Sequence, residues 1–277
     1  MSRQALATPG SELPDILRRI LAHKRAEVTA RKTRRPLGLV ERAARRAPAP
    51  RGFAEALRNA ARVRGAGVIA EIKRASPSRG ILREPFAPPW IARRYQATGA
   101  ACLSVLTDQA FFGGADGDLV VARAACELPV LRKEFVLDPY QVFESRALGA
   151  DCVLLIAAAL DDPSLAELYR LTRALDMACL VEVHDSDELE RALRLTPALL
   201  GINNRDLRRF ETRLETSIEL RAKVPPSVFC VAESGIAQVQ DRIRLQQAHI
   251  PGFLVGEAFM RASDPGTALA ALFFGEP

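Results

Sequence analysis

Residues 67–73 have the sequence Gly-Val-Ile-Ala-Glu-Ile-Lys, a short apolar run that ends in charged side chains. Seven similar runs follow along the chain, each rich in Val, Ile or Leu, and stretches of helix length separate them. Buried strands that alternate with amphipathic helices are typical of a parallel sheet. The predicted strands are residues 67–73, 101–107, 130–135, 152–156, 178–183, 199–203, 228–234 and 252–255.

The segments that follow these strands are predicted to be helices. Several begin with an acidic residue before a proline, as at Asp138-Pro139, Asp162-Pro163 and Asp264-Pro265, where a side chain can cap the first turn. Eight strand–helix units predict an α/β fold, a (β/α)8 TIM barrel. A doubly wound open sheet is the alternative, but no Gly-x-Gly-x-x-Gly follows the first strand. The predicted helices are residues 87–98, 116–126, 139–148, 164–175, 185–195, 215–222, 238–247 and 265–273.

The composition is that of a globular protein, with 277 residues of which 48% are hydrophobic. We expect one domain overall, in which residues 65–277 form the barrel and residues 1–64 form a basic helical extension packed on it. The extension holds 16 basic and 5 acidic side chains, whereas the net charge of the whole chain is only +6. This asymmetry could indicate a nucleic-acid or membrane partner, but no aromatic residues suited to stacking on bases accompany the charge. We expect neither partner and interpret the charge as the solvated face of a helix.

A helix is predicted to start at Pro14-Asp15 within this extension, because apolar residues then recur at helical spacing. The predicted docking stripe consists of Ile16, Leu17, Ile20 and Leu21.

Cysteine and histidine usage argues against a metal site. The five cysteines contain no Cys-x-x-Cys pair and most adjoin Leu, Val or Ala, so we expect reduced thiols in the core. A disulfide or a zinc cluster is the alternative, but only three histidines are present and metal sites need clustered ligands. No apolar run approaches the ~18 residues of a membrane span, and the first ten residues lack the apolar stretch of a secretory signal. We therefore expect a cytoplasmic protein without a bound metal.

Charged side chains occur near the carboxyl ends of the odd-numbered predicted strands. Because strand side chains alternate between faces, Glu71 and Lys73 share a face, and Lys133, Glu182 and Glu233 follow the same parity. Barrel enzymes place their chemistry at this end of the strands, so we expect the five side chains to converge in one cavity. Lysines and glutamates withdrawn from water can supply an acid and a base near neutral pH.

Glycines after the last two strands suggest a site for an anion. Ser234-Gly235 follows the seventh strand and Gly256 the eighth, and in many barrels the loops at these places bind a substrate phosphate through backbone N–H groups. The alternative is that these glycines only form tight turns. The loop at residues 76–80, which begins with Ser76, adds hydroxyls and the cation of Arg79.

In these segments the chain resembles the indole-3-glycerol-phosphate synthases of tryptophan biosynthesis. The resemblance extends from the helix near Asp15 to Asp264-Pro265 and covers most of the chain. The segments that carry it are residues 69–78 (IAEIKRASPS), 103–108 (LSVLTD), 131–135 (LRKEF), 149–156 (GADCVLLI), 201–207 (GINNRDL) and 232–236 (AESGI).

The resemblance implies the decarboxylating and dehydrating ring closure of 1-(2-carboxyphenylamino)-1-deoxyribulose 5-phosphate to indole-3-glycerol phosphate, with no cofactor. It implies that Lys133 is the general acid and Glu182 the general base. Lys73 resembles the second lysine, and which lysine delivers the second proton stays open. The resemblance further implies that Glu71 tunes the lysines and that Asn203 and Glu233 position the substrate chain. It implies a phosphate cradle formed by Ser234, Gly235 and Gly256, and an apolar pocket for the aromatic ring formed by Phe112, Phe135, Leu154, Ile156 and Leu207. Further candidates to contact substrate anions are Ser76 and Arg205.

This sequence departs from the family pattern at Glu134, where many members have Asp, at Ala115, where Ser is common, and at Glu257, where some members have Ser. A carboxylate at Glu257 would repel a phosphate if it entered the site, so only the backbone there is assigned to the phosphate cradle.

Three other functions stay open at this stage. An aldose–ketose isomerase would share the anion loops but does not need two lysines with three glutamates. A nucleic-acid or membrane binder would bind polyanions in a steeply salt-dependent way. A scaffold without activity would not need the proposed acid and base.

The role of the basic extension stays open as well. The resemblance suggests an extra helix over the barrel mouth, where its charge could attract an anionic substrate or where it could serve only as a lid.

Overall fold

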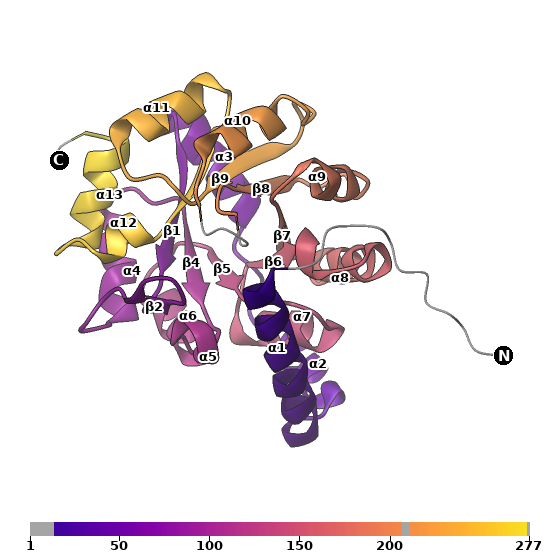
Figure 1. Ribbon diagram of the computed structural model, residues 1–277. Helices are drawn as coiled ribbons and strands as arrows, with labels where there is room; N and C mark the ends of the chain where they lie inside the picture. Colours follow the sequence, from indigo (N-terminus) through magenta and orange to yellow (C-terminus); the bar gives the residue numbers. More distant parts are fainter. Residues whose placement is uncertain (1–13, 207–210, 276–277) are drawn as a thin grey trace.

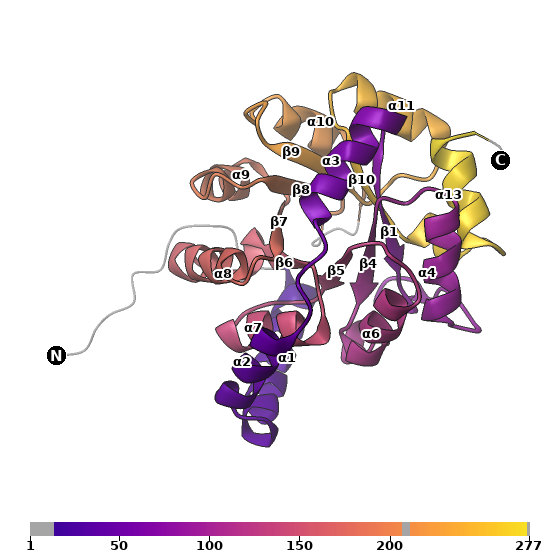
Figure 2. The same cartoon turned by 180° about the vertical axis from the view of Figure 1, so that it is seen from behind.

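The computed structural model describes residues 14–206 and 211–275, and its central feature is a closed barrel of eight parallel strands. The barrel order is β1-β10-β9-β8-β7-β6-β5-β4, and β4 pairs with β1 to close it. Helices surround the strands on the outside (Figure 1, Figure 2). The predicted barrel and all eight predicted strands are confirmed: β1 Gly67–Ile72, β4 Cys102–Leu106, β5 Val130–Lys133, β6 Cys152–Ile156, β7 Ala178–Val183, β8 Leu199–Asn203, β9 Phe229–Glu233 and β10 Gly252–Val255.

The predicted helices are also present, with small differences at their ends. The eighth helix of the chain begins at Asp162 rather than at residue 164, because Asp161 is the capping residue and accepts a hydrogen bond from the Ser164 backbone. Asp138 and Asp264 cap their helices as predicted. The helices are α4 Pro88–Ala97, α6 Asp116–Ala124, α7 Pro139–Leu148, α8 Asp162–Ala174, α9 Ser186–Leu193, α10 Leu214–Arg221, α11 Val239–Gln247 and α13 Pro265–Phe273.

Several short elements were not predicted. A hairpin follows the first barrel strand, and short helices lie in the loops after the strands β4, β6 and β10. They are β2 Ala75–Ser76, β3 Gly80–Ile81, α5 Gln109–Phe112, the 3₁₀ turn η1 Ala157–Ala159 and α12 Glu257–Met260.

Three helices precede the barrel: α1 Asp15–Arg34, α2 Leu37–Arg46 and α3 Phe53–Arg64. The helix α3 closes the end of the barrel where the strands begin (Figure 2). Its Phe53 and Leu57 are buried in the interior cluster with Ile69, and a side chain at Gly67 would meet the Leu57 carbonyl oxygen at 2.6 Å. Close backbone contact therefore seals this end, and the opposite end is left for the site.

The alternation of side chains along each strand separates two cores. Val68, Ala70 and Ile72 face the helices, whereas Ile69 joins Leu131 and other residues inside the barrel. This is the face assignment that the sequence predicts for β1. All five cysteines are free and buried, as expected for core thiols.

Among the described residues, no helix is long and apolar enough to cross a membrane. The same residues contain no group of three or more His, Cys, Asp or Glu side chains that could hold a metal ion.

Candidate active site

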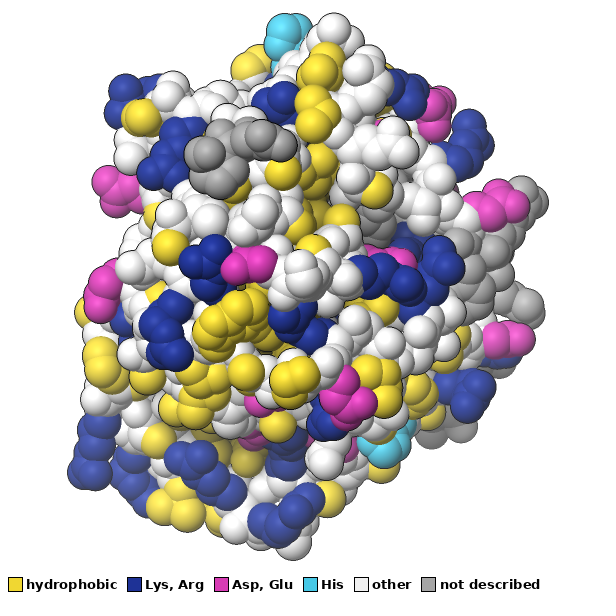
Figure 3. Space-filling view, turned by 90° about the vertical axis from the view of Figure 1, so that its left-hand side faces the viewer, with side chains coloured by type: hydrophobic (Ala, Val, Ile, Leu, Met, Phe, Trp, Pro, Cys, Tyr) yellow, Lys and Arg dark blue, Asp and Glu magenta, His cyan; other side chains and the backbone are white. Residues whose placement is uncertain are grey.

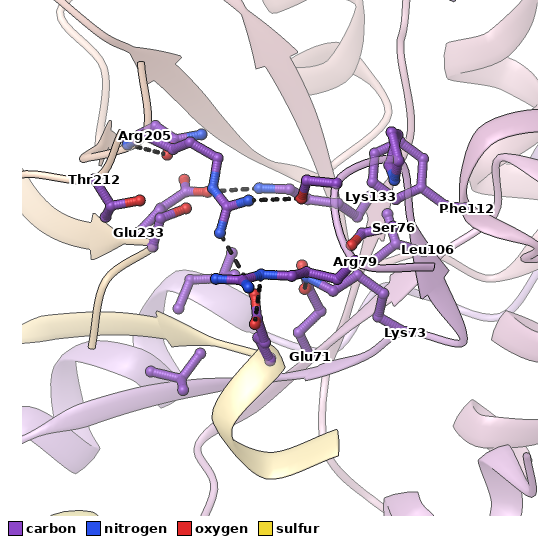
Figure 4. A pocket seen from close by; sticks show the side chains of 18 of the residues that line it. Glu71, Lys73, Ser76, Arg79, Leu106, Phe112, Lys133, Arg205, Thr212 and Glu233 are labelled. Atoms are coloured by element: carbon purple, nitrogen blue, oxygen red, sulfur yellow. Dashed lines mark hydrogen bonds and ion pairs between the residues drawn. The ribbon is translucent and has the colours of Figure 1, made fainter. Parts of the chain in front are cut away.

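A cavity of about 520 Å³ opens at the carboxyl ends of the barrel strands (Figure 4). The five charged side chains that strand parity predicts to converge all line it, which confirms the predicted geometry. Every other candidate site residue lines it as well, except Leu207, which lies outside the described residues. These other residues are Asn203, Ser76, Phe112, Phe135, Leu154, Ile156, Arg205, Ser234, Gly235 and Gly256.

The Lys133 ammonium lies at the centre of the polar wall, between two carboxylates from alternate strands. Its Nζ is 3.0 Å from Glu182 Oε2 and 2.5 Å from Glu233 Oε2. Both carboxylates are buried, and burial alone would lower the pKa of Lys133. The charges of Glu182, Glu233 and Glu71 outweigh that effect and raise the pKa of Lys133 above its ordinary value. Lys133 is therefore protonated at neutral pH, as an acid must be before it gives up its proton.

The two carboxylates around Lys133 differ in their protonation. Burial would raise the pKa of Glu182, but the charges of Lys133 and His184 hold it below its ordinary value. Burial together with the charge of Glu182 raises the pKa of Glu233 instead. One buried ammonium neutralises one buried carboxylate, so the second retains its proton more readily. Glu182 is thus the ionised group of the pair and can accept a proton.

Glu71 of β1 and Lys73, directly after this strand, form a second ion pair, with 2.5 Å between Nζ and Oε1. Two glycines make room for the carboxylates. A side chain at Gly256 would meet Glu71 Oε1 at 2.3 Å, and one at Gly201 would meet Glu233 Oε1 at 2.2 Å. Both contacts are far inside van der Waals distance, so any larger residue would displace a glutamate.

Three arginines gather around Glu257 at the edge of the cavity where the phosphate was expected. Glu257 lies 3.3 Å from Arg79, 3.5 Å from Arg205 and 3.4 Å from Arg261. Figure 4 shows Arg79 and Arg205 reaching toward each other from opposite sides. The single negative charge of Glu257 offsets the positive charge of only one of the three guanidinium groups. The Glu257 side chain does enter the cavity, but it does so within a cluster that stays positive.

The opposite wall is apolar. The rings of Phe112 and Phe135 are 6.1 Å apart at a tilt of 38°, and Leu154 and Ile156 from β6 lie in the same cavity. The first turns of α1 contribute Ile16, Leu17 and Ile20. The cavity therefore combines an apolar slot, a proton-transfer group and a cationic edge. The predicted docking stripe is largely confirmed, since Leu17, Ile20 and Leu21 are buried.

The comparisons with known proteins agree with this geometry. The family described as Indole-3-glycerol phosphate synthase matches residues 17–272. The chain is 54% identical over 261 residues to the indole-3-glycerol phosphate synthase of Polaromonas naphthalenivorans (strain CJ2), an alignment that covers 94% of this chain and 99% of that protein. It is 53% identical over 262 residues to the one from Acidithiobacillus ferrooxidans (strain ATCC 53993 / BNL-5-31), covering 95% of this chain and all of that protein. The chain belongs to the indole-3-glycerol phosphate synthase family.

Solved structures with low sequence identity share the fold alone. The N-acetylmannosamine-6-phosphate 2-epimerase of Clostridium perfringens superposes with a TM-score of 0.56 at 13% identity, covering 75% of this chain and 90% of that one. The thiamine phosphate pyrophosphorylase of Pyrococcus furiosus gives 0.55 at 15% identity, covering 76% and 94%.

Two of the three departures from the indole-3-glycerol phosphate synthase pattern can be explained by contacts. Glu134 Oε1 lies 3.0 Å from Lys24 Nζ and Glu134 Oε2 accepts from Thr107, so the longer acid is fully paired. Glu257 is neutralised by the arginines described above. Nothing in the structure explains Ala115, which precedes α6.

Sequence reasoning missed three charged residues near the site, of which one, Arg261, belongs to the arginine cluster at Glu257. Lys24 of α1 is buried and pairs with Asp108 at 2.9 Å as well as with Glu134. Lys24 follows Ile20 by four residues and Leu21 by three, so helical spacing places it on the docking stripe, and this was the available signal. His184, directly after β7, lies beside Glu182. His184 comes two positions after Glu182, so the alternation of side chains along a strand places it on the same face, and this alternation could have identified it.

Proposed function

We propose that this member of the indole-3-glycerol phosphate synthase family closes the indole ring by proton transfer between Lys133, Glu182 and the substrate. The observation that supports this most directly is the Lys133 ammonium held between Glu182 and Glu233 inside the cavity. A protonated lysine and an ionised carboxylate are then available at the same place, as general acid–base catalysis requires.

In the first step the ring carbon that bears the carboxylate attacks the ketone carbon of the substrate. Lys133 donates its proton to the ketone oxygen, which becomes a hydroxyl group. The carboxylate leaves as carbon dioxide, and its electron pair restores the aromatic ring. The cavity's apolar wall at Phe112 and Phe135 would orient the ring for this attack.

In the second step the new hydroxyl leaves as water and Glu182 takes a proton from the adjacent methylene carbon. The departing hydroxyl needs a proton, and we assign it to Lys73, whose ion pair with Glu71 holds it in the cavity. The two lysines give two protons to the substrate and Glu182 takes one from it, so the substrate gains one proton in total. This gain balances the charge, because the negatively charged carboxylate leaves as neutral carbon dioxide. Every step uses side chains of this chain.

The rest of the cavity would bind the substrate's sugar phosphate. Asn203 and Glu233 would hold the hydroxyls of the chain, and Glu233 Oε1 is buried without a hydrogen-bond partner among the described residues. The phosphate would lie at Ser234, Gly235 and Gly256 with Arg205. Ser234 and Gly235 both have positive φ, at 64° and 78°, which sets the turn of this loop.

The decisive experiment is to add 1-(2-carboxyphenylamino)-1-deoxyribulose 5-phosphate to the pure chain and follow the indole fluorescence of the product. We expect Lys133→Met and Glu182→Gln each to lower kcat by about 10²–10⁴-fold, because each removes a proton-transfer group. Glu182→Gln should keep its substrate affinity, since the amide preserves the shape. Retained turnover in Lys133→Met would contradict its role as acid, and turnover of an aldose phosphate instead would indicate an isomerase.

Two further assignments belong to this proposal. We propose that residues 1–64 act as an extension of the catalytic barrel formed by residues 65–277, because α1 supplies part of the cavity wall and α3 seals the other end. We also propose a cytoplasmic location with a phosphorylated small molecule as the partner. Five free thiols suit a reducing compartment.

A further inference from the structure

His184 links the proposed base to an acidic residue outside the cavity. Its Nε2 is 3.4 Å from Glu182 Oε1, and its Nδ1 is 3.0 Å from Glu188 Oε2. The Glu188 carboxylate also accepts the His184 backbone N–H at 2.8 Å. The imidazole therefore lies between two carboxylates, one from β7 and one from the first turn of α9. It does not line the cavity, so it would act on the substrate only through Glu182.

Each oxygen of Glu182 has a polar neighbour. Lys133 contacts Oε2, while Asn203 donates to Oε1 at 3.2 Å. The imidazole of His184 approaches the same Oε1 as an ion-pair neighbour, and its buried Nε2 makes no hydrogen bond among the described residues. Removing the imidazole would leave Oε1 with its hydrogen bond from Asn203 but without its ion-pair partner, so the electrostatic restraint on this end of the carboxylate would weaken.

The charges around this pair come from three elements. Lys133 of β5 and Glu233 of β9 face Glu182 from inside the barrel, and Glu188 of α9 faces His184 from outside. Burial would lower the pKa of His184, but the hydrogen bond to Glu188 and the charge of Glu182 raise it to about 9. At neutral pH the group beside Glu182 is a cation.

We propose that His184, held in its charged form by Glu188, is a positioning residue that keeps the Glu182 carboxylate ionised and directed at the substrate. This inference rests on the proposed role of Glu182 as base. It adds a second cation to Lys133, which must give up its own proton during turnover. The imidazolium would keep Glu182 ionised while Lys133 is neutral.

The first test is the pH dependence of kcat in the full chain. In the wild type, kcat should fall as pH rises through about 9, where the imidazolium is lost. Glu188→Gln should move this fall downward by about one pH unit, because one carboxylate partner loses its charge. His184→Gln should lower kcat by about tenfold with a small change in KM, and its kcat should not show the fall near pH 9. His23→Gln, the same change at an exposed position, should match the wild type. The proposal is overturned if kcat of Glu188→Gln falls at the same pH as in the wild type, or if His184→Gln keeps the wild-type kcat.

The second test does not depend on turnover. The chain has three histidines, so the imidazole NMR signal of His184 can be assigned as the one that His184→Gln removes. Coupling between two groups is reciprocal, so Glu182→Gln should lower the titration midpoint of His184 by about one pH unit. An unchanged midpoint overturns the inference. Failure of the wild type to make the indole product would instead refute the proposed function, while the titration would still decide whether His184 and Glu182 interact.

Discussion

Glu182 shows how far single residues can be predicted from sequence. Its place in the cavity follows from strand parity, because a residue two positions after an inward-facing Leu180 must face inward too. His184 has the same parity, yet its contact with Glu188 depends on where α9 begins, which strand geometry does not fix. Side-chain partners across elements depend on the packing of those elements, so the pairing was not predictable.

Gly256 offers a prediction at this scale. Gly256→Ala would place a methyl group 2.3 Å from Glu71 Oε1 and 2.9 Å from its Cβ, so Glu71 must move and its ion pair with Lys73 must loosen. We expect kcat/KM to fall by about tenfold or more and the unfolding free energy to fall by about 1–3 kcal/mol. The matched control is Gly117→Ala, exposed in α6 with no atom within 4 Å, which should leave activity unchanged. Equal activity of the two variants would contradict the steric argument.

The pH dependence of stability gives a second prediction at this scale. The pKa of His184 is raised from 6.5 to about 9 by Glu188 and Glu182, so its ionic contribution to folding is fully present below pH 6.5. The contribution is lost as pH rises through about 9. The difference in unfolding free energy between the wild type and His184→Gln should therefore be about 3 kcal/mol larger at pH 6 than at pH 10. Urea unfolding at both pH values measures it; a difference that is independent of pH would show that the imidazolium is not stabilised.

At the scale of elements, the sequence predicted the parts of the fold that have a clear period. The eight strands and their following helices came from apolar runs and caps. The helices α2 and α3 were not predicted separately, because the basic residues of the extension hide their short apolar stripes. The loop elements β2, β3, α5 and α12 span two to four residues each, which is too short for any periodicity to indicate them.

The helix α1 is attached to the barrel by a buried ion cluster rather than by its apolar stripe alone. Lys24 contacts Glu27, Asp108 and Glu134, and the last two carboxylates are almost fully buried. Burial would lower the pKa of Lys24, but Glu134 and the other carboxylates raise it. Asp108 also caps α5, which carries Phe112, and Glu134 follows Lys133 directly. The cluster therefore connects three parts of the chain that line the cavity: α1, the helix α5 with Phe112, and the end of β5 with Lys133.

Lys24→Met should accordingly lower the unfolding free energy by about 3–5 kcal/mol, because it leaves two buried carboxylates without their cation. Lys32→Met is the matched control on the same helix. Lys32 also pairs with a carboxylate of the barrel, Asp138, at 2.6 Å, but its side chain is 42% exposed. An exposed pair is worth about 0–1 kcal/mol, so this variant should lose little. Denaturant unfolding of both compares them, and equal losses would mean that burial of the Lys24 cluster contributes nothing.

At the scale of the whole molecule, the most uneven feature is the concentration of basic side chains in the first 64 residues. The first 64 residues hold 16 basic and 5 acidic side chains, so their excess of positive charge is larger than the net charge of +6 of the whole chain. Several Lys and Arg side chains are exposed on the lower part of one face, among hydrophobic and uncharged side chains (Figure 3). Some of these cations have structural partners: Arg31 pairs with Asp116 and Glu144, and Lys24 is buried. Removing α1 would unpair those carboxylates, so a truncated chain cannot separate attraction of the substrate from stability.

Charge-neutral substitutions on an intact α1 can separate them. Arg18 and Arg19 are exposed in the first turns of α1, which line the cavity, and Arg25 is exposed further along the same helix. If they attract the anionic substrate, replacing all three by Gln should lower kcat/KM by about tenfold at low salt. The loss should shrink near physiological salt, where charges are screened beyond about 8 Å. The same replacement at Arg58, Arg62 and Arg64 on α3, which seals the opposite end of the barrel, keeps the net charge change and should leave kcat/KM nearly unchanged. Equal salt dependence of kcat/KM in both triple variants and the wild type would exclude attraction and leave α1 as a lid that shields the ring closure from water.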